Sequence, residues 1–223
     1  MHKKWMGLGA GLLTLAVTAV AQDSAPSGGQ SSAPFRLSSA YVVDGQTISP
    51  SMVGASARCG GGRNQSPQLS WSGVPAGTKS FALGLFDPDA RQGQGFSHWL
   101  VYNIPASATG LDAGAGGNMV MATSAASTDA ASMASAPALP DGAVNGANGA
   151  GQPGYTGACP PAGDPPHHYV FTLYALDVDS LTVPDTTTAA DLPAAVQGHT
   201  LGTATLTGTY GIPKATTSGA SGQ

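Results

Sequence analysis

The sequence predicts a mainly β protein, and three observations carry that prediction. Runs of β-branched, aromatic and aliphatic residues recur at the length of a strand along most of the chain. Clusters of Gly, Pro, Asp and Asn, which favour turns, separate these runs. Beyond the N-terminus, one short segment carries a helical pattern. Because the strand signals continue without a linker-like break, one β domain of about 200 residues is favoured over two smaller ones.

Strands are expected, in chain order, at residues 35–43, 68–71, 80–86, 99–104, 169–176 and 203–210. The segments 80–86 and 99–104 are apolar almost throughout, which is typical of central strands. Asp44-Gly45 is a turn signal after the first segment. A helix is expected at about Thr187–Gln197, because threonines offer N-caps there and Gly198 offers a C-cap. Pro193 is compatible only with the first turn of such a helix.

The termini and one internal segment are expected to lie outside the packed core. Residues 1–21 combine a basic start, a short apolar run and the cleavage signal Ala19-Val20-Ala21, which is the pattern of a secretory signal peptide. The alternative is a membrane anchor, but the run is shorter than the roughly 20 residues that span a bilayer. Residues 22–34 and 214–223 are expected to be disordered. Residues 113–151, rich in Ala, Gly, Ser and Met, are expected to form a mobile insertion.

The export signal and the charge balance limit the possible partners. A secretory signal places the protein in the periplasm or outside the cell. Without the signal peptide, six basic residues face twelve acidic ones, a net charge of −6, and every acidic residue is Asp. This balance argues against a nucleic-acid partner, which requires a basic patch, and against docking on an anionic membrane. No segment after the signal peptide is apolar enough to span a membrane.

The chain contains two cysteines, Cys59 and Cys159. An even pair in an oxidising compartment favours a disulfide, which would close a loop of roughly 100 residues. Buried thiols or a metal site are the alternatives. Because the two residues are far apart and no CxxC motif is present, a zinc site is the weaker interpretation.

Polar residues suited to chemistry at neutral pH gather in the segments 80–105 and 154–176. Asp87 ends an apolar strand, where its carboxylate can hold an imidazole in one tautomer. His98 begins the next apolar run, and taken alone it would be interpreted as a core histidine. His167 and Tyr169 stand at the mouth of a further strand. If these four side chains converge, they form a pocket that suits an anion, with His, Tyr and loop N–H groups as donors.

The same residues leave other interpretations open. Two histidines and one carboxylate are also a known metal-ligand set, although the HExxH spacing is absent. A serine hydrolase is less favoured, because the sequence has no GxSxG elbow. Asp89, two residues after Asp87, is expected to accept backbone N–H groups in an Asx-type turn.

These residues, in this order, resemble the phosphatidylethanolamine-binding protein family, also called Raf-kinase-inhibitor-like proteins, and in particular its secreted bacterial branch. The resemblance rests on the collinear blocks CGGGRNQSPQLSWSGVPAGTKSFAL, LFDPDA, GFSHWLVYNIPA, NGANGAGQPGYTGACPPAGDPPHHYVFTLYALD and HTLGTATLTGTYG. Together they cover roughly residues 35–211, apart from the low-complexity insertion. The resemblance implies an antiparallel β-sandwich over residues 35–213, with a few short peripheral helices.

The resemblance further implies a small pocket that accepts phosphate or a phosphorylated head group. The family's pocket residues fall on Asp87, His98, His167, Tyr169, Pro160 and Pro161. Two positions depart from the family pattern. Arg91 replaces the usual proline after DPDA, which loosens the turn and places a charge near the rim. His168 replaces the arginine of an HRY motif, which exchanges a permanent charge for a pH-dependent one.

The favoured function is therefore a non-catalytic binding protein for a small phosphate-bearing anion, with no cofactor and no metal. One alternative is a protein-interaction or inhibitor module, in which the pocket is vestigial and exposed loops contact an unknown protein partner. The other is a metal-dependent hydrolase that uses Asp87, His98 and His167.

Overall fold

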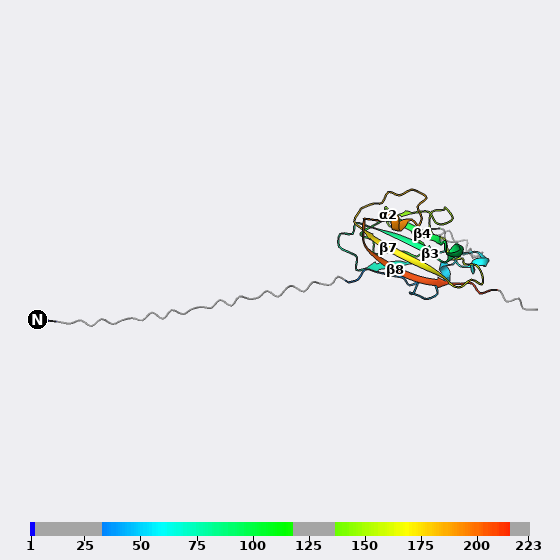
Figure 1. Cartoon of the computed structure of the whole chain (residues 1–223), viewed down its shortest axis with the longest axis horizontal. Helices are drawn as coiled ribbons and strands as arrows, with labels where there is room; N and C mark the ends of the chain where they lie inside the picture. The colour runs from blue at the N-terminus through cyan, green and yellow to red at the C-terminus, as the bar shows by residue number, and fades with distance from the viewer. Residues whose placement is uncertain (3–32, 118–136, 215–223) are drawn as a thin grey trace, which may run out of the picture. The chain divides into compact units, whose positions relative to one another are not determined.

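Two antiparallel sheets make up the fold, in a computed structural model that describes residues 1–2, 33–117 and 137–214. The smaller sheet has the strand order β1-β2-β5 and the larger has the order β6-β4-β3-β7-β8. The long strands of the larger sheet lie side by side in Figure 1. The strands are β1 (Arg36–Ser38), β2 (Leu69–Ser72), β3 (Ser80–Asp87), β4 (Phe96–Pro105), β5 (Gly110–Leu111), β6 (Val144–Asn145), β7 (His167–Leu176) and β8 (Thr200–Tyr210). Short helical turns are η1 (Pro50–Met52), η2 (Ala57–Cys59), α1 (Ala90–Gly93) and α2 (Leu192–Ala195).

The main core lies between the two sheets. On the smaller sheet the side chains that point inward alternate with exposed ones, so that Leu37 and Trp71 are buried. The indole of Trp71 meets the ring of Phe81 on β3, with 5.2 Å between ring centroids. Burying each such side chain contributes about 1.5–3 kcal/mol, so these contacts hold the sheets together. The expected antiparallel β architecture is confirmed.

The larger sheet is buried on its second face as well. Ala82 of β3 and Leu100 of β4 pack with Leu192 and Val196, which come from α2 and the residue after it. Strand β3 is therefore covered from both sides, and it occupies the middle of the five-stranded sheet. This explains the nearly continuous apolar sequence of 80–86 and confirms that β3 and β4 are central strands.

The helix in this covering segment is shorter than predicted. It spans Leu192–Ala195 rather than Thr187–Gln197. The Asp191 carboxylate accepts hydrogen bonds from the backbone N–H and the hydroxyl of Thr188, which closes residues 188–191 into a turn before the helix begins. Pro193 lies in the first turn, where the missing N–H costs nothing. The C-cap is Val196 rather than the expected Gly198, which lies two residues further on with a positive φ of 84°.

Residues 41–43 do not form the expected continuation of the first strand, because β1 ends at Ser38. The following segment runs instead along the outer edge of β8. The N–H groups of Gly45 and Ile48 donate to the carbonyl oxygens of Thr207 and Thr209, at 2.8 and 2.9 Å. These bonds cover part of an edge that would otherwise expose unpaired backbone groups.

The low-complexity segment 113–151 is partly built into the domain. Ala115 and Asn148 are 4% and 3% exposed, and β6 within the segment pairs with β4. Small residues are used here for close packing: a Cβ on Gly146 would lie 2.5 Å from the Leu100 side chain. The centre of the segment, 118–136, lies outside the described residues, as do nearly all of the expected signal peptide, tether and C-terminal tail.

A disulfide joins Cys59 and Cys159, which are 100 residues apart. It ties η2 to the loop that precedes β7, which confirms the pairing favoured from the sequence. Among the described residues, no helix is both long enough and apolar enough to cross a bilayer.

Candidate functional site

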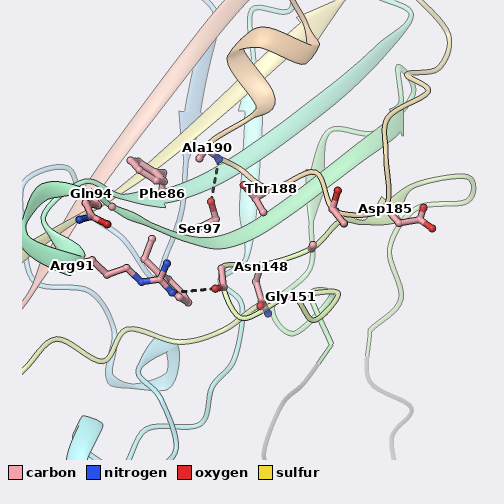
Figure 2. A pocket seen from close by; sticks show the side chains of 14 residues that line it. Phe86, Arg91, Gln94, Ser97, Asn148, Gly151, Asp185, Thr188 and Ala190 are labelled. Atoms are coloured by element: carbon pink, nitrogen blue, oxygen red, sulfur yellow. Dashed lines mark hydrogen bonds between the residues drawn. The ribbon is translucent and has the colours of Figure 1, made fainter.

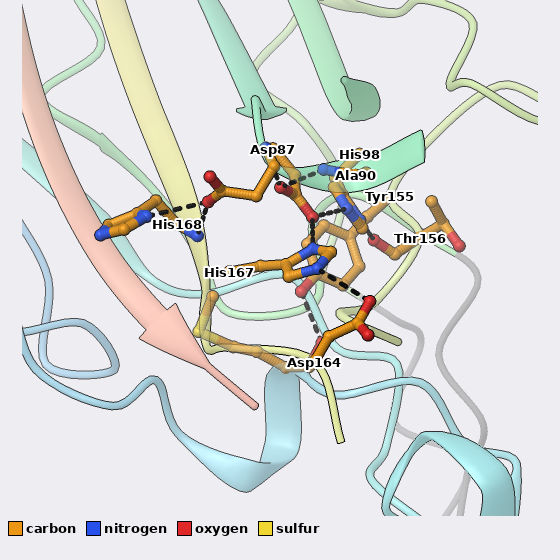
Figure 3. A network of polar contacts seen from close by, with 10 residues as sticks. Asp87, Ala90, His98, Tyr155, Thr156, Asp164, His167 and His168 are labelled. Atoms are coloured by element: carbon orange, nitrogen blue, oxygen red, sulfur yellow. Dashed lines mark hydrogen bonds and ion pairs between the residues drawn. The ribbon is translucent and has the colours of Figure 1, made fainter. Parts of the chain in front are cut away.

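Three of the predicted site residues meet where the central strands of the larger sheet begin or end. β3 is antiparallel to both β4 and β7, so the end of β3 lies beside the starts of its two neighbours. Asp87 ends β3, His98 lies near the start of β4, and His167 begins β7. Figure 3 shows the two imidazoles on either side of the Asp87 carboxylate. All three are buried, with exposures of 2%, 5% and 6%.

A β-bulge turns His98 toward Asp87. Leu85 pairs with Trp99, whereas Phe86 pairs with Ser97, so His98 is an extra residue without a partner on β3. Strict alternation would place His98 on the face opposite to Trp99. The bulge places both side chains on the inner face, which is the face that carries Asp87.

The Asp87 carboxylate uses both oxygens. Oδ1 accepts the N–H groups of Asp89 and Ala90, at 2.9 and 3.1 Å, which closes the turn after β3. Oδ2 accepts Nδ1–H of His167 at 2.8 Å and lies 3.9 Å from Nε2 of His98. Burial raises the pKa of this carboxyl, but the histidines and the turn N–H together outweigh burial and hold its pKa below the ordinary value. Asp87 is therefore an anion at neutral pH.

These contacts define which imidazole nitrogens carry protons. The carbonyl oxygen of Thr156 can only accept, so Nδ1 of His98, at 2.8 Å from it, donates. Nδ1 of His167 donates to Asp87 for the same reason. In the neutral form each histidine then has an unprotonated Nε2, which lies 3.9 Å from Oδ2 of Asp87 in His98 and 4.0 Å from Oδ2 of Asp164 in His167. Nε2 becomes a donor when the ring takes up a proton.

Both histidines line a pocket of about 620 Å³, which we call the histidine pocket. Pro160 and Pro161 form part of its wall. Two further lining residues, Arg58 and Arg91, carry permanent positive charges. Within the described residues no hydrogen bond or ion pair engages the Arg58 guanidinium. The pocket thus combines a buried carboxylate, two imidazoles and two guanidinium groups.

Tyr169 does not line the histidine pocket, although the sequence places it among the expected donors. It lies behind His98, with 5.2 Å between ring centroids, and is 1% exposed. Its hydroxyl has no hydrogen-bond partner among the described protein atoms. Burial is the main cause of the raised pKa of Tyr169. The tyrosine supports the imidazole from the core side.

The loop N–H groups are also less available than expected. Thr156 N–H donates to the carbonyl of His98, and Gly157 N–H donates to Oδ1 of Asn64. Pro160 and Pro161 have no N–H group. Among the lining side chains, the histidines, the arginines and the hydroxyl of Thr156 can donate to an anion.

Asp89 does not close the turn as expected; Asp87 does. The Asp89 carboxylate instead accepts both the N–H and Nδ1–H of His168, at 2.7 and 2.8 Å. These bonds lower the pKa of Asp89. The pair lies on the outer face of the sheet, since successive residues of β7 point to opposite faces, and His168 is exposed. His168 is thus separated from the histidine pocket.

The described part of the chain contains no group of three or more His, Cys, Asp or Glu side chains placed to hold one metal ion. In Asp87, His98 and His167, both Nδ1 atoms and both carboxylate oxygens already have hydrogen-bond partners in the protein.

Comparison with known proteins agrees with this architecture. Residues 38–211 match the family model described as phosphatidylethanolamine-binding protein. The Escherichia coli UPF0098 protein YbcL is 39% identical over 180 residues, which covers 81% of this chain and 89% of YbcL. LppC of Mycobacterium tuberculosis, whose name describes a candidate lipoprotein, is 34% identical over 177 residues, covering 79% of this chain and 72% of LppC.

Solved structures give the same result. The crystal structure of YbcL, described as a new member of the mammalian PEBP family, superposes with a TM-score of 0.67 over 81% of this chain and 99% of that one. The Chlamydia trachomatis homologue CT736 has a TM-score of 0.58 at 32% identity, and the match covers 79% of this chain and 97% of CT736. From the fold, the cluster of Asp87, His98 and His167 and these matches together, we conclude that this chain belongs to the phosphatidylethanolamine-binding protein family.

Proposed function

We propose that this chain binds a small phosphate-bearing anion in the histidine pocket and does not itself catalyse a reaction. The observation that carries the proposal is the fixed orientation of the two imidazoles. With Nδ1 of His98 and His167 held by Thr156 and Asp87, protonation of each ring creates one donor, at Nε2. Charged N–H groups are strong donors to phosphate oxygens.

The charges in the pocket support the same conclusion. Asp87 alone would repel an anion, but the guanidiniums of Arg58 and Arg91, which line the same pocket, offset its charge. Arginine also offers paired N–H groups that match phosphate oxygens. Cys159, which lines the pocket, is held in the disulfide and is not available as a nucleophile.

Export to the periplasm or the cell exterior is part of the proposal. It is supported by the signal-like pattern of residues 1–21, by the disulfide and by the lipoprotein-like name of the relative LppC. Cell fractionation is expected to recover the protein outside the cytoplasm, shortened by the N-terminal segment.

The binding proposal is tested by phosphorus NMR titration of inorganic phosphate and O-phosphoethanolamine. Saturable binding is expected for the wild type. His98→Ala and His167→Ala should each weaken it by about tenfold or more, because each removes one charge-assisted hydrogen bond. His168→Ala is the matched control, since His168 lies on the other face of β7 and should leave affinity unchanged.

Circular dichroism and thermal melts of the same variants separate lost binding from lost folding. Folded His98→Ala and His167→Ala variants that retain wild-type affinity would contradict the assignment of the pocket. A wild type that binds neither phosphate compound would favour the protein-interaction alternative.

A further inference from the structure

A second pocket adjoins the histidine pocket at the start of β4. It has a volume of about 610 Å³, and we call it the Asp185 pocket. Figure 2 shows it between the β3–β4 turn, the loop around Asn148 and the segment that leads to α2. Arg91 and Phe96 line both pockets. They form the boundary between the two.

The boundary is held in place by several contacts. Arg91 has left-handed backbone angles, with φ of 52° and ψ of 43°, which proline cannot adopt. Its guanidinium carbon lies 4.9 Å from the centre of the Phe96 ring, and its Nη2 donates to the carbonyl of Gly149 at 3.2 Å. A Cβ on Gly149 would lie only 2.7 Å from that ring. Arg91, where the family usually has proline, is therefore built into the wall.

The Asp185 pocket has polar groups of both hydrogen-bonding types. Its lining residues include Asp185, Gln94 and Thr186, all three of which are exposed to solvent. Within the described residues none of these side chains makes a hydrogen bond. The rings of Phe86 and Phe96 add apolar surface. A carboxylate disfavours a second anion, whereas acceptors, donors and ring faces together suit neutral hydroxyl groups on a carbon skeleton.

We propose that the ligand is a phosphorylated polyol of about the size of a sugar phosphate. Its phosphate lies in the histidine pocket, its hydroxyl-bearing part lies in the Asp185 pocket, and Arg91 contacts both parts. The proposal rests on the proposed function, because it requires the histidine pocket to bind phosphate. It makes Arg91 and Asp185 specificity-determining residues.

Isothermal titration calorimetry of the mature chain tests this with inorganic phosphate, ethyl phosphate, glucose 6-phosphate and glucose. Glucose 6-phosphate is expected to bind about tenfold more tightly than phosphate or ethyl phosphate, because only its hydroxyl groups can bond in the Asp185 pocket. Asp185→Ala should abolish this preference and leave phosphate affinity intact. Asp179→Ala, an exposed acidic residue of the same connection that does not line the pocket, is the matched control and should retain the preference.

Arg91→Ala provides the second variant, with Arg36→Ala on β1 as its control. Arg91→Ala is expected to lose the preference for glucose 6-phosphate and, because Arg91 also lines the histidine pocket, to bind every phosphate more weakly, whereas Arg36→Ala should retain both properties. If phosphate binds in a His98-dependent manner but all three phosphates bind equally, the polyol proposal is overturned while the proposed function stands. If ethyl phosphate and glucose 6-phosphate exceed inorganic phosphate in affinity by the same factor, the hydroxyl groups contribute nothing. That result also overturns the polyol proposal. If the wild type binds no phosphate compound, both proposals fail.

Discussion

At the residue scale, Asp87 connects the turn after β3 to both histidines. One oxygen accepts the N–H groups of Asp89 and Ala90, and the other faces His98 and His167. Replacing it therefore disturbs backbone and imidazoles together. Its lowered pKa also links the folded state to pH.

We expect Asp87→Asn to lower the free energy of unfolding by about 1–3 kcal/mol near neutral pH, because hydrogen bonds to a charged group are lost. The folded pKa of Asp87 is below its ordinary value of 3.8. The charged form therefore stabilises the fold above that pH, and the stabilisation is lost as the pH falls through the folded pKa. Urea unfolding of wild type and variant should give a difference that shrinks on acidification.

Asp177→Asn is the control for this experiment. Asp177 pairs with His199 at 3.0 Å, but both side chains are 47% exposed, and exposed pairs contribute little. A difference between wild type and Asp87→Asn that is as large in strong acid as at neutral pH would contradict the role given to the Asp87 charge.

Tyr169 and Tyr155 offer a matched pair of buried hydroxyls. The Tyr155 hydroxyl donates to the Met52 carbonyl at 2.6 Å, whereas that of Tyr169 has no partner among the described atoms. We expect Tyr155→Phe to lower stability by about 1–2 kcal/mol and Tyr169→Phe to leave it unchanged or raise it by about 1 kcal/mol. Chemical denaturation measures both. Equal losses in the two variants would show that the Tyr169 hydroxyl is satisfied in solution.

The sequence predicts some of the site residues and misses others for identifiable reasons. Asp87 and His167 follow from their places at strand ends. The inward direction of His98 depends on a bulge, which alternation cannot reveal. Arg58 carries no signal, because it is a single arginine in a Gly-rich stretch and reaches the pocket only through the fold. Tyr169 matches a family position, but the structure places it behind the pocket wall.

At the scale of elements, the disulfide joins two walls of the histidine pocket. Arg58 precedes Cys59 in η2, and Pro160 and Pro161 follow Cys159. All three neighbours line the pocket. The bridge is therefore a covalent link between two walls of the pocket that the rest of the fold only brings close together.

We expect the double variant Cys59→Ser/Cys159→Ser to lose about 2–5 kcal/mol of stability, since the bridge closes a loop of 100 residues. Its phosphate affinity should also fall, because the pocket walls gain freedom. Guanidinium unfolding and phosphate titration, each with and without a reductant, measure these effects. Reductant should lower the stability and the phosphate affinity of the wild type and leave both quantities unchanged in the double variant. If neither reductant nor the double substitution lowers these two quantities, the role given to the disulfide is contradicted.

The long strands were predictable because continuous apolar runs, or alternating apolar and polar residues, mark them in the sequence. Strands β5 and β6, of two residues each, are too short for any periodicity. Helix α2 shortened because the Thr188–Asp191 turn competed with the expected N-cap. Residues 41–43 have strand-like composition, but the chain leaves the smaller sheet after Ser38 and follows the edge of β8.

At the scale of the described domain, the antiparallel order of β4, β3 and β7 explains why distant segments form one site. One strand end and two strand starts lie at the same sheet edge, so a carboxylate and two imidazoles meet although 80 residues separate Asp87 from His167. His168 and Asp89 lie on the outer face of the sheet, against which the segment around α2 packs. The sheet therefore separates them from this cluster. The fold thereby leaves His98 and His167 as the two histidines at the pocket.

The central claim is that Nε2 of His98 and His167 receives the anion. Nitrogen-15 NMR of histidine-labelled protein, recorded as phosphate is added at constant pH, tests it most directly. We predict that the Nε2 signals of His98 and His167 move toward the values of a protonated ring while their Nδ1 signals stay protonated, and that those of His168 and His199 do not move. Unchanged Nε2 signals of His98 and His167 at saturating phosphate would contradict the account.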